Sequence, residues 1–389
     1  MRGGGSPLHE RDSGHAPVRV LSVILLPTTA CNCNCTYCFE VRDDSRPYDP
    51  SWPSVLRGLR PMCEMLGAET LRLFWQGGEI LCLEPREFRE AVEAATRAVD
   101  GLGIKVQHHV QTNLLLYDSR RWRDVLMPLV NGKLSSSLDF PNRYRVAPGM
   151  DGEAYLARWL DRRAAAEDDG FEISAISLAS PETLALGAER FHAFYRDGIG
   201  LRRVQVNFPF PTPGRQFAPL DLDQLAAFMC DLYSLWVASG RDLHLSPFTL
   251  LESSLLRGYP PTFCIYSYTC AADLLAIGPA GEVAQCDSFL TTYREFAYGS
   301  LARGEARDVV HSPRRRQYLE RPLRLMRESE CADCEFLSVC FGGCPIRAYA
   351  FGHGFFARDH YCSVYKALFR TIVETNQSSE RVERLMPCA

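Results

Sequence analysis

The 389-residue chain lacks any apolar run that approaches the roughly 20 residues of a membrane-spanning helix. Residues 1–17 are rich in Gly, Arg and His and lack an apolar signal core, so we expect a loose tail there rather than a secretory signal. The formal net charge of -4 gives the whole chain no reason to bind nucleic acid or an anionic membrane. These absences favour a cytoplasmic globular protein without nucleic-acid or membrane partners.

Cysteine is the residue type in excess, with 16 copies. Thiols stay reduced in the cytoplasm, where dense cysteine indicates metal or redox chemistry more often than disulfides. The chain is long enough for two or three domains and a large core. The spacing of the cysteines therefore carries more information than their number.

Three cysteines near the N-terminus have the spacing C-x3-C-x2-C: Cys31, Cys35 and Cys38. Three thiolates on one short loop can hold three irons of a cubane cluster, which normally has four cysteine ligands. The fourth iron would stay open, as a catalytic metal keeps an open position. Cys33 lies between two of these candidates and is interpreted as a spectator. A structural zinc loop or a set of free thiols is the alternative.

Strand-like apolar runs alternate with helical patterns through the first two thirds of the chain. We predict strands at 18–27, 69–75, 104–111, 133–138, 171–178 and 201–208. We predict helices at 52–66, 84–99, 122–130, 153–168, 182–196 and 221–238. The alternation indicates parallel βαβ units, and six of them suggest a barrel or partial barrel. It stops near Leu245, where we place a domain boundary.

An unusual polar motif follows each of the first four predicted strands. The motifs are the cysteine loop, Gln76-Gly77-Gly78-Glu79, Gln111-Thr112-Asn113 and Ser137-Leu138-Asp139. In barrels of parallel strands, chemistry collects at the C-terminal ends of the strands. The motifs are therefore expected to form one shared site.

Eight further cysteines follow in the last third of the chain: Cys264, Cys270, Cys286, Cys331, Cys334, Cys340, Cys344 and Cys362. Eight thiolates are enough for two fully ligated four-iron clusters. A pair of zinc ribbons is the alternative, because C-x2-C alone is a common zinc half-site.

With all these motifs together, the sequence resembles the radical SAM superfamily, and specifically its SPASM subgroup of peptide and protein maturases. The first loop matches C-x3-C-x2-C with an aromatic residue, Tyr37, before the third cysteine. The GGE motif is present, although Ile80 replaces the proline that usually follows it, and the QTN, SLD and later cysteine patterns match too. The resemblance implies an α/β fold, with a partial (β/α)6 TIM-type barrel over 18–245 and a cysteine-rich SPASM auxiliary-cluster domain over 246–389.

The resemblance also implies the cofactors: S-adenosylmethionine and three [4Fe-4S] clusters. The first cluster would bind S-adenosylmethionine through its open iron. One electron from an external reductant of the flavodoxin or ferredoxin type would then yield a 5′-deoxyadenosyl radical. By analogy, the first auxiliary cluster is held by Cys264, Cys270, Cys286 and Cys344. The second is held by Cys331, Cys334, Cys340 and Cys362.

The residues expected around S-adenosylmethionine are Tyr37, Glu40, Gln76, Gly77, Gly78, Glu79, Ser137 and Arg158. Gly77 and Gly78 would let the backbone approach the methionyl ammonium, and Glu79 would support that strand end. Ser137 is a candidate for the methionyl carboxylate. Glu40 is a candidate contact for the nucleoside, and Gln76 is one for the substrate. Arg158 is a candidate for the carboxylate, with a solvated helix arginine as the alternative.

Asp287 directly follows Cys286 and matches the general base of sulfatase maturases beside the first auxiliary cluster. Hydrogen abstraction, proton loss and electron transfer to a cluster sum to a two-electron oxidation, which needs a well-placed carboxylate. A turn aspartate that bonds its own backbone is the alternative.

The expected function is therefore that of an enzyme, a radical SAM oxidoreductase that modifies a side chain of a ribosomally made peptide, forming an intramolecular crosslink. We expect the peptide to be recognised through barrel and SPASM surfaces, since few residues precede Cys31. The alternatives are formylglycine formation on a protein Ser or Cys, and oxidation of a small molecule such as an amino sugar. An electron carrier would need none of the nucleoside-binding motifs.

Overall fold

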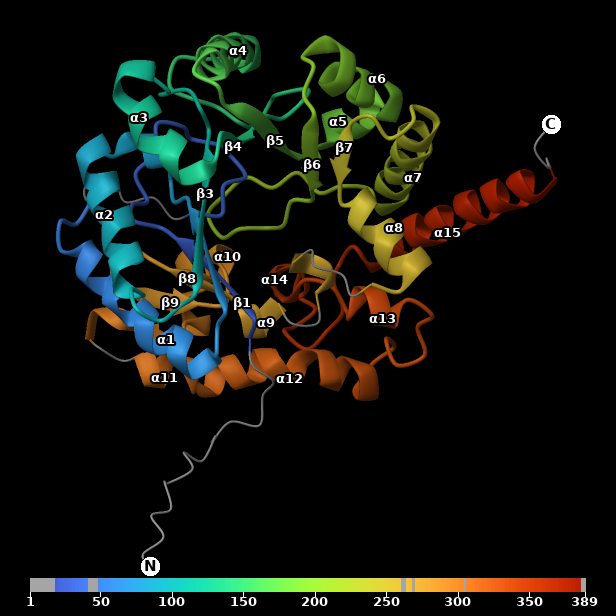
Figure 1. Cartoon of the computed structure of the whole chain (residues 1–389). Coiled ribbons are helices and arrows are strands. Elements are labelled where there is room, and N and C mark those ends of the chain that lie inside the picture. The colour runs from blue at the N-terminus through green and yellow to red at the C-terminus, as the bar shows by residue number, and fades with distance from the viewer. Residues whose placement is uncertain (1–17, 41–47, 260–263, 268–269, 304–305, 386–389) are drawn as a thin grey trace, which may run out of the picture.

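The computed structural model describes residues 18–40, 48–259, 264–267, 270–303 and 306–385. The predicted tail at 1–17 lies outside these residues. Cys388, which belongs to none of the cysteine groups described above, also lies outside them. Figure 1 shows a curved sheet with helices along its outer side and a second group of helices and loops that closes against it. Of the helices in the described part, none combines the length and apolar character needed to cross a bilayer.

Within the described residues, ten strands form one sheet in the order β10-β9-β8-β1-β2-β3-β4-β5-β6-β7. All six predicted strands are present, and β1 to β7 pair in parallel with their neighbours. The predicted partial barrel is therefore confirmed. The strands are β1 (Val20–Leu25), β2 (Thr70–Trp75), β3 (Lys105–Thr112), β4 (Lys133–Ser137), β5 (Glu172–Leu178), β6 (Arg203–Asn207), β7 (His244–Ser246), β8 (Leu274–Ile277), β9 (Glu282–Ala284) and β10 (Gly299–Ser300).

Helices connect the barrel strands at the predicted places. They are η1 (Trp52–Gly58), α1 (Leu59–Leu66), η2 (Ile80–Cys82), α2 (Pro85–Ala98), α3 (Ser119–Val130), α4 (Gly152–Asp168), α5 (Pro181–Leu186), α6 (Ala188–Ala193), η3 (Phe194–Gly198) and α7 (Leu222–Ala238). The predicted helix at 182–196 is divided at Gly187. Its φ of +87° breaks the helical path, and a residue without Cβ adopts that φ freely.

The two faces of the barrel strands differ in burial. In β5 every second residue is buried and the residues between are half-buried, as the period of a strand dictates. The buried residues face the outer helices: Trp75 of β2, for example, packs edge-on against Trp52 and Phe88, with ring centroids 6.2 and 5.2 Å apart. The residues of the inner face are half-buried in the middle of the strands and exposed at the starts of β4 and β6.

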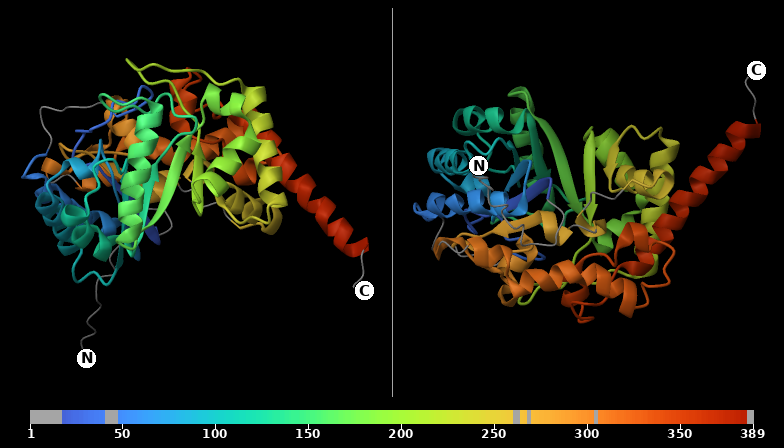
Figure 2. Two further views of the ribbon diagram at one scale, coloured as in Figure 1. Left: turned by 90° about the horizontal axis from the view of Figure 1, so that it is seen from above. Right: turned by 60° about the horizontal axis from the view of Figure 1, so that its bottom comes forward.

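The cysteine-rich segment returns to the same sheet. Its strand β8 pairs in parallel with β1, on the edge opposite β2, and β9 and β10 add antiparallel strands. Its helices are α8 (Phe248–Arg257), η4 (Cys264–Tyr266), α9 (Cys270–Asp273), α10 (Asp287–Thr291), η5 (Arg294–Phe296), η6 (Leu301–Arg303), α11 (Ala306–Val310), α12 (Pro313–Glu328), α13 (Leu337–Cys340), α14 (Pro345–Ala350) and α15 (Cys362–Leu385). Figure 2 shows α15 extending away from the body of the molecule.

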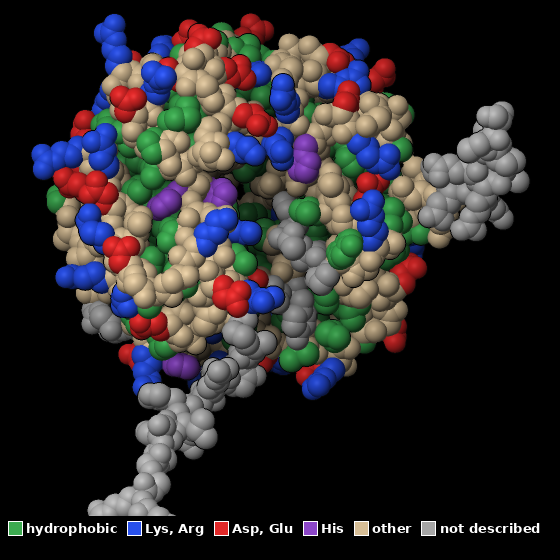
Figure 3. Space-filling view, in the orientation of Figure 1, with side chains coloured by type: hydrophobic (Ala, Val, Ile, Leu, Met, Phe, Trp, Pro, Cys, Tyr) green, Lys and Arg blue, Asp and Glu red, His purple; other side chains and the backbone are tan. Residues whose placement is uncertain are grey.

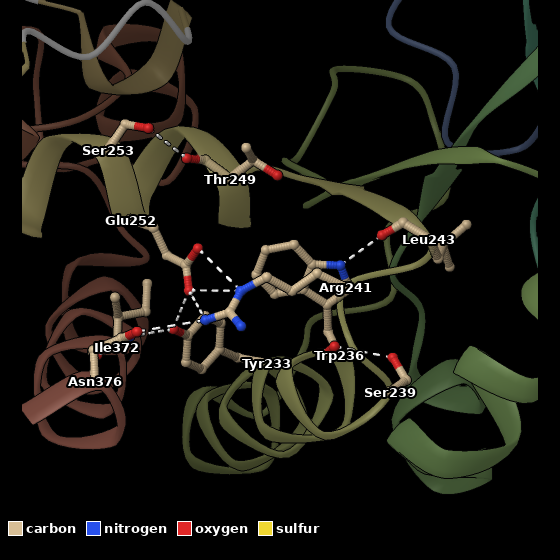
Figure 4. A network of polar contacts seen from close by, with 10 residues as sticks. All are labelled: Tyr233, Trp236, Ser239, Arg241, Leu243, Thr249, Glu252, Ser253, Ile372 and Asn376. Carbon is tan, nitrogen blue, oxygen red and sulfur yellow. Dashed lines mark hydrogen bonds and ion pairs between the residues drawn. The ribbon is translucent and has the colours of Figure 1, made fainter. Parts of the chain in front are cut away.

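The predicted boundary at Leu245 falls inside β7, where a polar network joins α7, α8 and α15 (Figure 4). Glu252 of α8 accepts hydrogen bonds from the Tyr233 hydroxyl at 2.7 Å and from Arg241 Nη2 at 2.8 Å. Asn376 of α15 donates to the same hydroxyl at 2.7 Å. The end of the barrel is therefore fixed directly to the C-terminal helix.

Replacing Glu252 with leucine should destabilise the protein. The change leaves the buried hydroxyl of Tyr233 and the guanidinium of Arg241 without their acceptor, which costs about 1 to 3 kcal/mol. The measurement is the urea midpoint followed by tryptophan fluorescence. Glu328→Leu, which breaks an exposed pair with Arg324 on α12, is the matched control and should shift the midpoint little. Equal shifts in the two variants would contradict the role of the network.

Candidate active site

The first cysteine loop follows β1 and crosses the C-terminal ends of the neighbouring strands. Its backbone pairs with the segment beyond β4: Asn34 N donates to Val146 O at 2.7 Å, and Thr36 N donates to Tyr144 O at 2.9 Å. At the end of β3, Asn113 Nδ2 donates to Asn32 Oδ1 at 2.7 Å. The structure thus gathers three of the predicted strand-end motifs around this loop.

Gly77 and Gly78 hold the entry to the cysteine loop against the end of β2. Gly78 N donates to Thr28 O at 3.0 Å, and Glu79 N donates to Ala30 O at 2.9 Å. A Cβ on Gly77 would lie 2.3 Å from Thr28 O, and one on Gly78 would lie 2.3 Å from Ala30 O. The chain's own backbone therefore requires both glycines. Their expected contact with a methionyl ammonium stays a prediction.

Glu79 is buried and uses both carboxylate oxygens on its own chain. Oε1 accepts from the Thr112 hydroxyl at 2.6 Å and from Leu81 N at 2.9 Å, and Oε2 accepts from Asn113 N at 2.6 Å. Burial raises the pKa of Glu79, while these donors act in the opposite direction. Glu79 therefore supports the ends of β2 and β3.

Asp139 makes the equivalent connection at the end of β4. The Tyr37 hydroxyl donates to Asp139 Oδ2, Arg145 Nε lies 3.3 Å from that oxygen, and Leu178 N donates to Oδ1 at 2.9 Å. The Arg145 guanidinium also lies over the Tyr37 ring, 5.7 Å from its centroid. Sequence reasoning missed Arg145. The sole signal for it was an arginine close behind a strand-end motif.

The cysteine loop favours deprotonated thiols at two of its three candidate ligands. A hydrogen bond from Cys33 and the charge of Arg145 lower the pKa of Cys35 to about 7, although burial opposes them. The Cys33 hydrogen bond also lowers the pKa of Cys31. Burial raises the pKa of Cys38 to about 12. Thiolate is the form that binds metal, and Cys33, interpreted as a spectator, supports it here.

Gln76 at the end of β2 meets Asp287 at the start of α10. Gln76 Nε2 donates to Asp287 Oδ2 at 2.5 Å, and Ser288 N donates to Oδ1 at 2.9 Å. Burial raises the pKa of Asp287. The structure therefore joins two residues predicted to act near the substrate, one from each half of the chain. Asp287 also makes the local backbone contact of a turn aspartate.

Glu40 lies beside this pair and is 5% exposed. Burial and the charge of Asp287 raise its pKa well above the usual range. Its Oε2 atom is buried and has no hydrogen-bond partner among the described residues. Such an atom usually receives a bond from a bound group or water, which fits the expected nucleoside contact.

The last two predicted cofactor contacts differ in placement. Ser137 lies on the inner face of β4, where its Oγ accepts from Gln111 Nε2 at 2.8 Å. Arg158 lies on α4 with a side chain 41% exposed, and it pairs with Asp161 at 3.8 Å. The structure leaves Arg158 on the helix surface, in agreement with the solvated-arginine alternative.

The four cysteines predicted for the second auxiliary cluster line one pocket of about 340 Å3: Cys331, Cys334, Cys340 and Cys362. Among the described residues, no three metal-binding side chains converge on the position of a single ion. Burial raises the pKa of Cys340 and Cys362, and neighbouring thiolates of the group raise it further. The thiols therefore surround a common space.

The four cysteines predicted for the first auxiliary cluster are also neighbours: Cys264, Cys270, Cys286 and Cys344. Burial raises the pKa of Cys270, and the charges of Cys264 and Cys344 add to the effect. Burial also raises the pKa of Cys286, and the charges of Cys344 and Cys270 add to the effect. A pocket of about 350 Å3 is lined by Cys264, Cys270 and Gln285. This group adjoins Asp287.

Arg321 of α12, which sequence reasoning also missed, fixes the loop between the two groups. Cys340 belongs to one group and Cys344 to the other. The buried Arg321 guanidinium donates to the carbonyl oxygens of Gly343 at 2.9 Å, Gly342 at 3.2 Å, Phe355 at 2.8 Å and Ala357 at 2.7 Å. One cation therefore holds both cysteine groups in place.

Comparison with known proteins identifies relatives across nearly the whole chain, although no family model matches. The chain is 22% identical over 377 residues to a cysteine-type anaerobic sulfatase-maturating enzyme of Clostridium perfringens, covering 90% of this chain and 95% of that one. It is 22% identical over 363 residues to a serine-type anaerobic sulfatase-maturating enzyme of Bacteroides thetaiotaomicron, covering 85% and 84%.

Two solved structures share the fold. Native anSMEcpe with bound AdoMet matches with a TM-score of 0.74 at 18% identity, over 92% of this chain and 99% of that one. Streptococcus suis SuiB bound to the precursor peptide SuiA matches with a TM-score of 0.60 at 16% identity, over 89% and 76%. The predicted resemblance to radical SAM SPASM maturases is confirmed, and with it the predictions of the fold class and of an enzyme.

Replacing Gly78 with alanine should displace the cysteine loop, because the new Cβ would meet Ala30 O and Thr29 O at 2.3 and 2.4 Å. The buried Cys35 thiol should then react faster with iodoacetamide, as mapped by mass spectrometry. Gly198→Ala is the control, since its Cβ meets nothing closer than 3.7 Å. An unchanged alkylation rate at Cys35 in the Gly78 variant would contradict the packing described.

Proposed function

We propose that the chain is a radical S-adenosylmethionine maturase that oxidises a side chain of a ribosomally made peptide and forms an intramolecular crosslink. The observation that carries the proposal is the contact between Gln76 and Asp287. It places a carboxylate from the cysteine-rich half at the end of β2, beside Cys286. A proton acceptor, a strand end for a nucleoside cofactor and a cysteine group thus share one location.

The residues fit the groups that the proposal requires. Cys31, Cys35 and Cys38 would hold the cluster that binds S-adenosylmethionine, and the two later cysteine groups would hold the auxiliary clusters. When bound, these groups supply hydrogen-atom abstraction and a one-electron acceptor. The buried Glu40 Oε2, which has no hydrogen-bond partner among the described residues, offers a polar atom to the bound cofactor. The barrel over 18–245 and the SPASM domain over 246–389 would carry these parts.

Asp287 would take up the proton that the substrate loses. Burial raises its pKa, which makes its carboxylate a stronger base near neutral pH. Gln76 holds Oδ2 by its hydrogen bond and so fixes the direction of the carboxylate. Loss of one hydrogen atom, one proton and one electron from the substrate balances as a two-electron oxidation.

Formylglycine formation on a protein Ser or Cys is the second candidate, because the curated relatives are sulfatase-maturating enzymes. Ile80 in place of proline and Phe140 in place of the glycine that often follows Asp139 count against a standard sulfatase maturase. The SuiB structure contains a precursor peptide, in line with a peptide substrate. A hydrazide probe separates the two candidates, since it captures the aldehyde of formylglycine and leaves a crosslinked peptide unlabelled.

Anaerobic reconstitution with iron and sulfide should load about twelve irons, four for each of three cubane clusters. S-adenosylmethionine and a reductant should then release 5′-deoxyadenosine. Cys35→Ala should lose about four irons and all deoxyadenosine formation, because it removes one thiolate of the first group. Retained deoxyadenosine formation in that variant would refute the radical assignment. Cys63→Ala, at a buried thiol outside the three groups, is the control and should keep both properties.

Replacing Asp287 with asparagine should separate cofactor cleavage from product formation. The variant keeps the shape of the side chain, and its amide oxygen can still accept from Ser288 N, but it cannot accept a proton. We expect wild-type deoxyadenosine release with product reduced at least about a hundredfold, the usual contribution of a general base. Product is measured by peptide mass spectrometry. Normal product yield would reduce Asp287 to a turn residue.

A further inference from the structure

The inner face of the barrel forms a polar lining that leads to the candidate site. The buried residues of β2 to β7 face the outer helices, so the alternate residues face inward. Between its two ends the lining is uncharged: Phe74 and Ile176 are apolar, and six residues are polar. The polar residues are Gln107, Ser135, Ser174 and Gln205, followed by Gln111 and Ser137 at the C-terminal end. Their amides and hydroxyls can bond the backbone of an extended peptide.

The two ends of this lining differ. The cysteine loop covers the C-terminal end, where it is bonded to Tyr144, Val146 and Asn113. At the N-terminal end, inward-facing side chains are exposed: Arg72, Lys105, His109, Lys133, Arg203 and His244. Figure 3 shows a hollow in the face of the molecule, with Lys, Arg and His side chains around it. This end therefore gives a substrate an open route to the inner face of the barrel.

The charges at the N-terminal end are predominantly positive. Among the inward-facing residues of the described strands β2 to β7, the acidic residue is Glu172. It pairs with Arg203 at 3.3 Å. Arg72 donates to the neutral Gln107 at 3.1 Å. Within the described segments, neither Arg72 nor Lys133 has a carboxylate at ion-pair distance. Burial, followed by the charge of Arg72, lowers the pKa of His109, which keeps this residue neutral beside the cations.

The strand geometry sets the distance from these cations to the site. Arg72 lies four residues before Gln76 on β2, and Lys133 lies four residues before Ser137 on β4. At about 3.3 Å per residue, each separation is about 13 Å, the length of roughly four residues of extended peptide. A peptide side chain at Gln76 and Asp287 would therefore place a residue about four positions away beside Arg72. The strand register sets Lys133 level with Phe74, so Lys133 lies beside a residue about two positions away.

We propose that the N-terminal end of the barrel is the entrance for the peptide, and that Arg72 and Lys133 select substrates with carboxylates about two to four residues from the side chain to be modified. The substrate class is thus an acidic peptide segment in extended conformation. This inference rests on the proposed function, of which it specifies the substrate. Attraction by these cations would also orient the peptide as it enters.

A binding experiment on the reconstituted holoenzyme tests the proposal without knowledge of the natural substrate. The probe is a labelled, acetylated and amidated Gly-Ser peptide that ends in two glutamates, and its match ends in two glutamines. Fluorescence anisotropy should show tighter binding of the glutamate probe, with a preference that falls as salt rises. Arg72→Gln with Lys133→Gln should weaken it about tenfold, as loss of charge-assisted bonds predicts. Arg86→Gln, at an exposed arginine on the outer face of α2, should not.

Carbodiimide coupling locates the bound probe, because the probe has no amine and its carboxylates react with enzyme lysines. The sequence has lysine at positions 105, 133 and 366. Coupling should occur at Lys133 and Lys105, and excess unlabelled probe should suppress it. Equal binding of the two probes, or equal coupling at Lys366, would overturn the proposal. Deoxyadenosine release from the same samples reports separately on the proposed function.

Discussion

Two buried carboxylates, Glu79 and Asp139, join the strand ends that lie beside the cysteine loop. Glu79 ties β2 to β3, and Asp139 ties β4 and β5 to Tyr37 within the loop. Each is costly to bury alone, and each is compensated by several donors. Because the donors to each carboxylate come from different strands, these hydrogen bonds fix the strand ends relative to one another and to the loop. The positions of Cys31, Cys35 and Cys38 follow from that arrangement.

The same sheet brings the two halves of the chain into one site. Since β8 pairs with β1, the segment that carries Cys286 and Asp287 lies beside the first cysteine loop. Asp287 then meets Gln76 of the barrel, while Arg321 positions the loop that supplies a cysteine to each later group. The Asp287 carboxylate and an adjoining cysteine group are fixed by one framework. Reactions that remove a proton and an electron from the same substrate need this proximity.

The sequence predicted the barrel well, because its evidence was local: strand period, helix period and polar residues at strand ends. The six strands and the strand-end cluster rest on such patterns, whereas the grouping of the later cysteines came from the resemblance to SPASM maturases. Arg145 and Arg321 could not be found in this way, since each acts on backbone or carboxylate groups far away in sequence. The glycines show a further limit. Gly77 and Gly78 were expected to make room for a ligand, yet the close approach of the backbone of residues 28–30 already requires glycine at both positions. Arg158 was assigned to the methionyl carboxylate by its spacing from Ser137, but in the structure it lies on the surface of α4 and pairs with Asp161.

The barrel is electrostatically asymmetric, although the whole chain carries a net charge of only -4. Carboxylates gather at the covered end, where Glu40, Glu79, Asp139 and Asp287 lie, and cations gather at the open end. A neutral or acidic total therefore conceals a local field that points along the barrel axis. The cations attract an acidic peptide at the entrance, so its carboxylates would remain near Arg72 and Lys133 while an uncharged side chain advances. That separation of charge would select which side chain reaches Asp287.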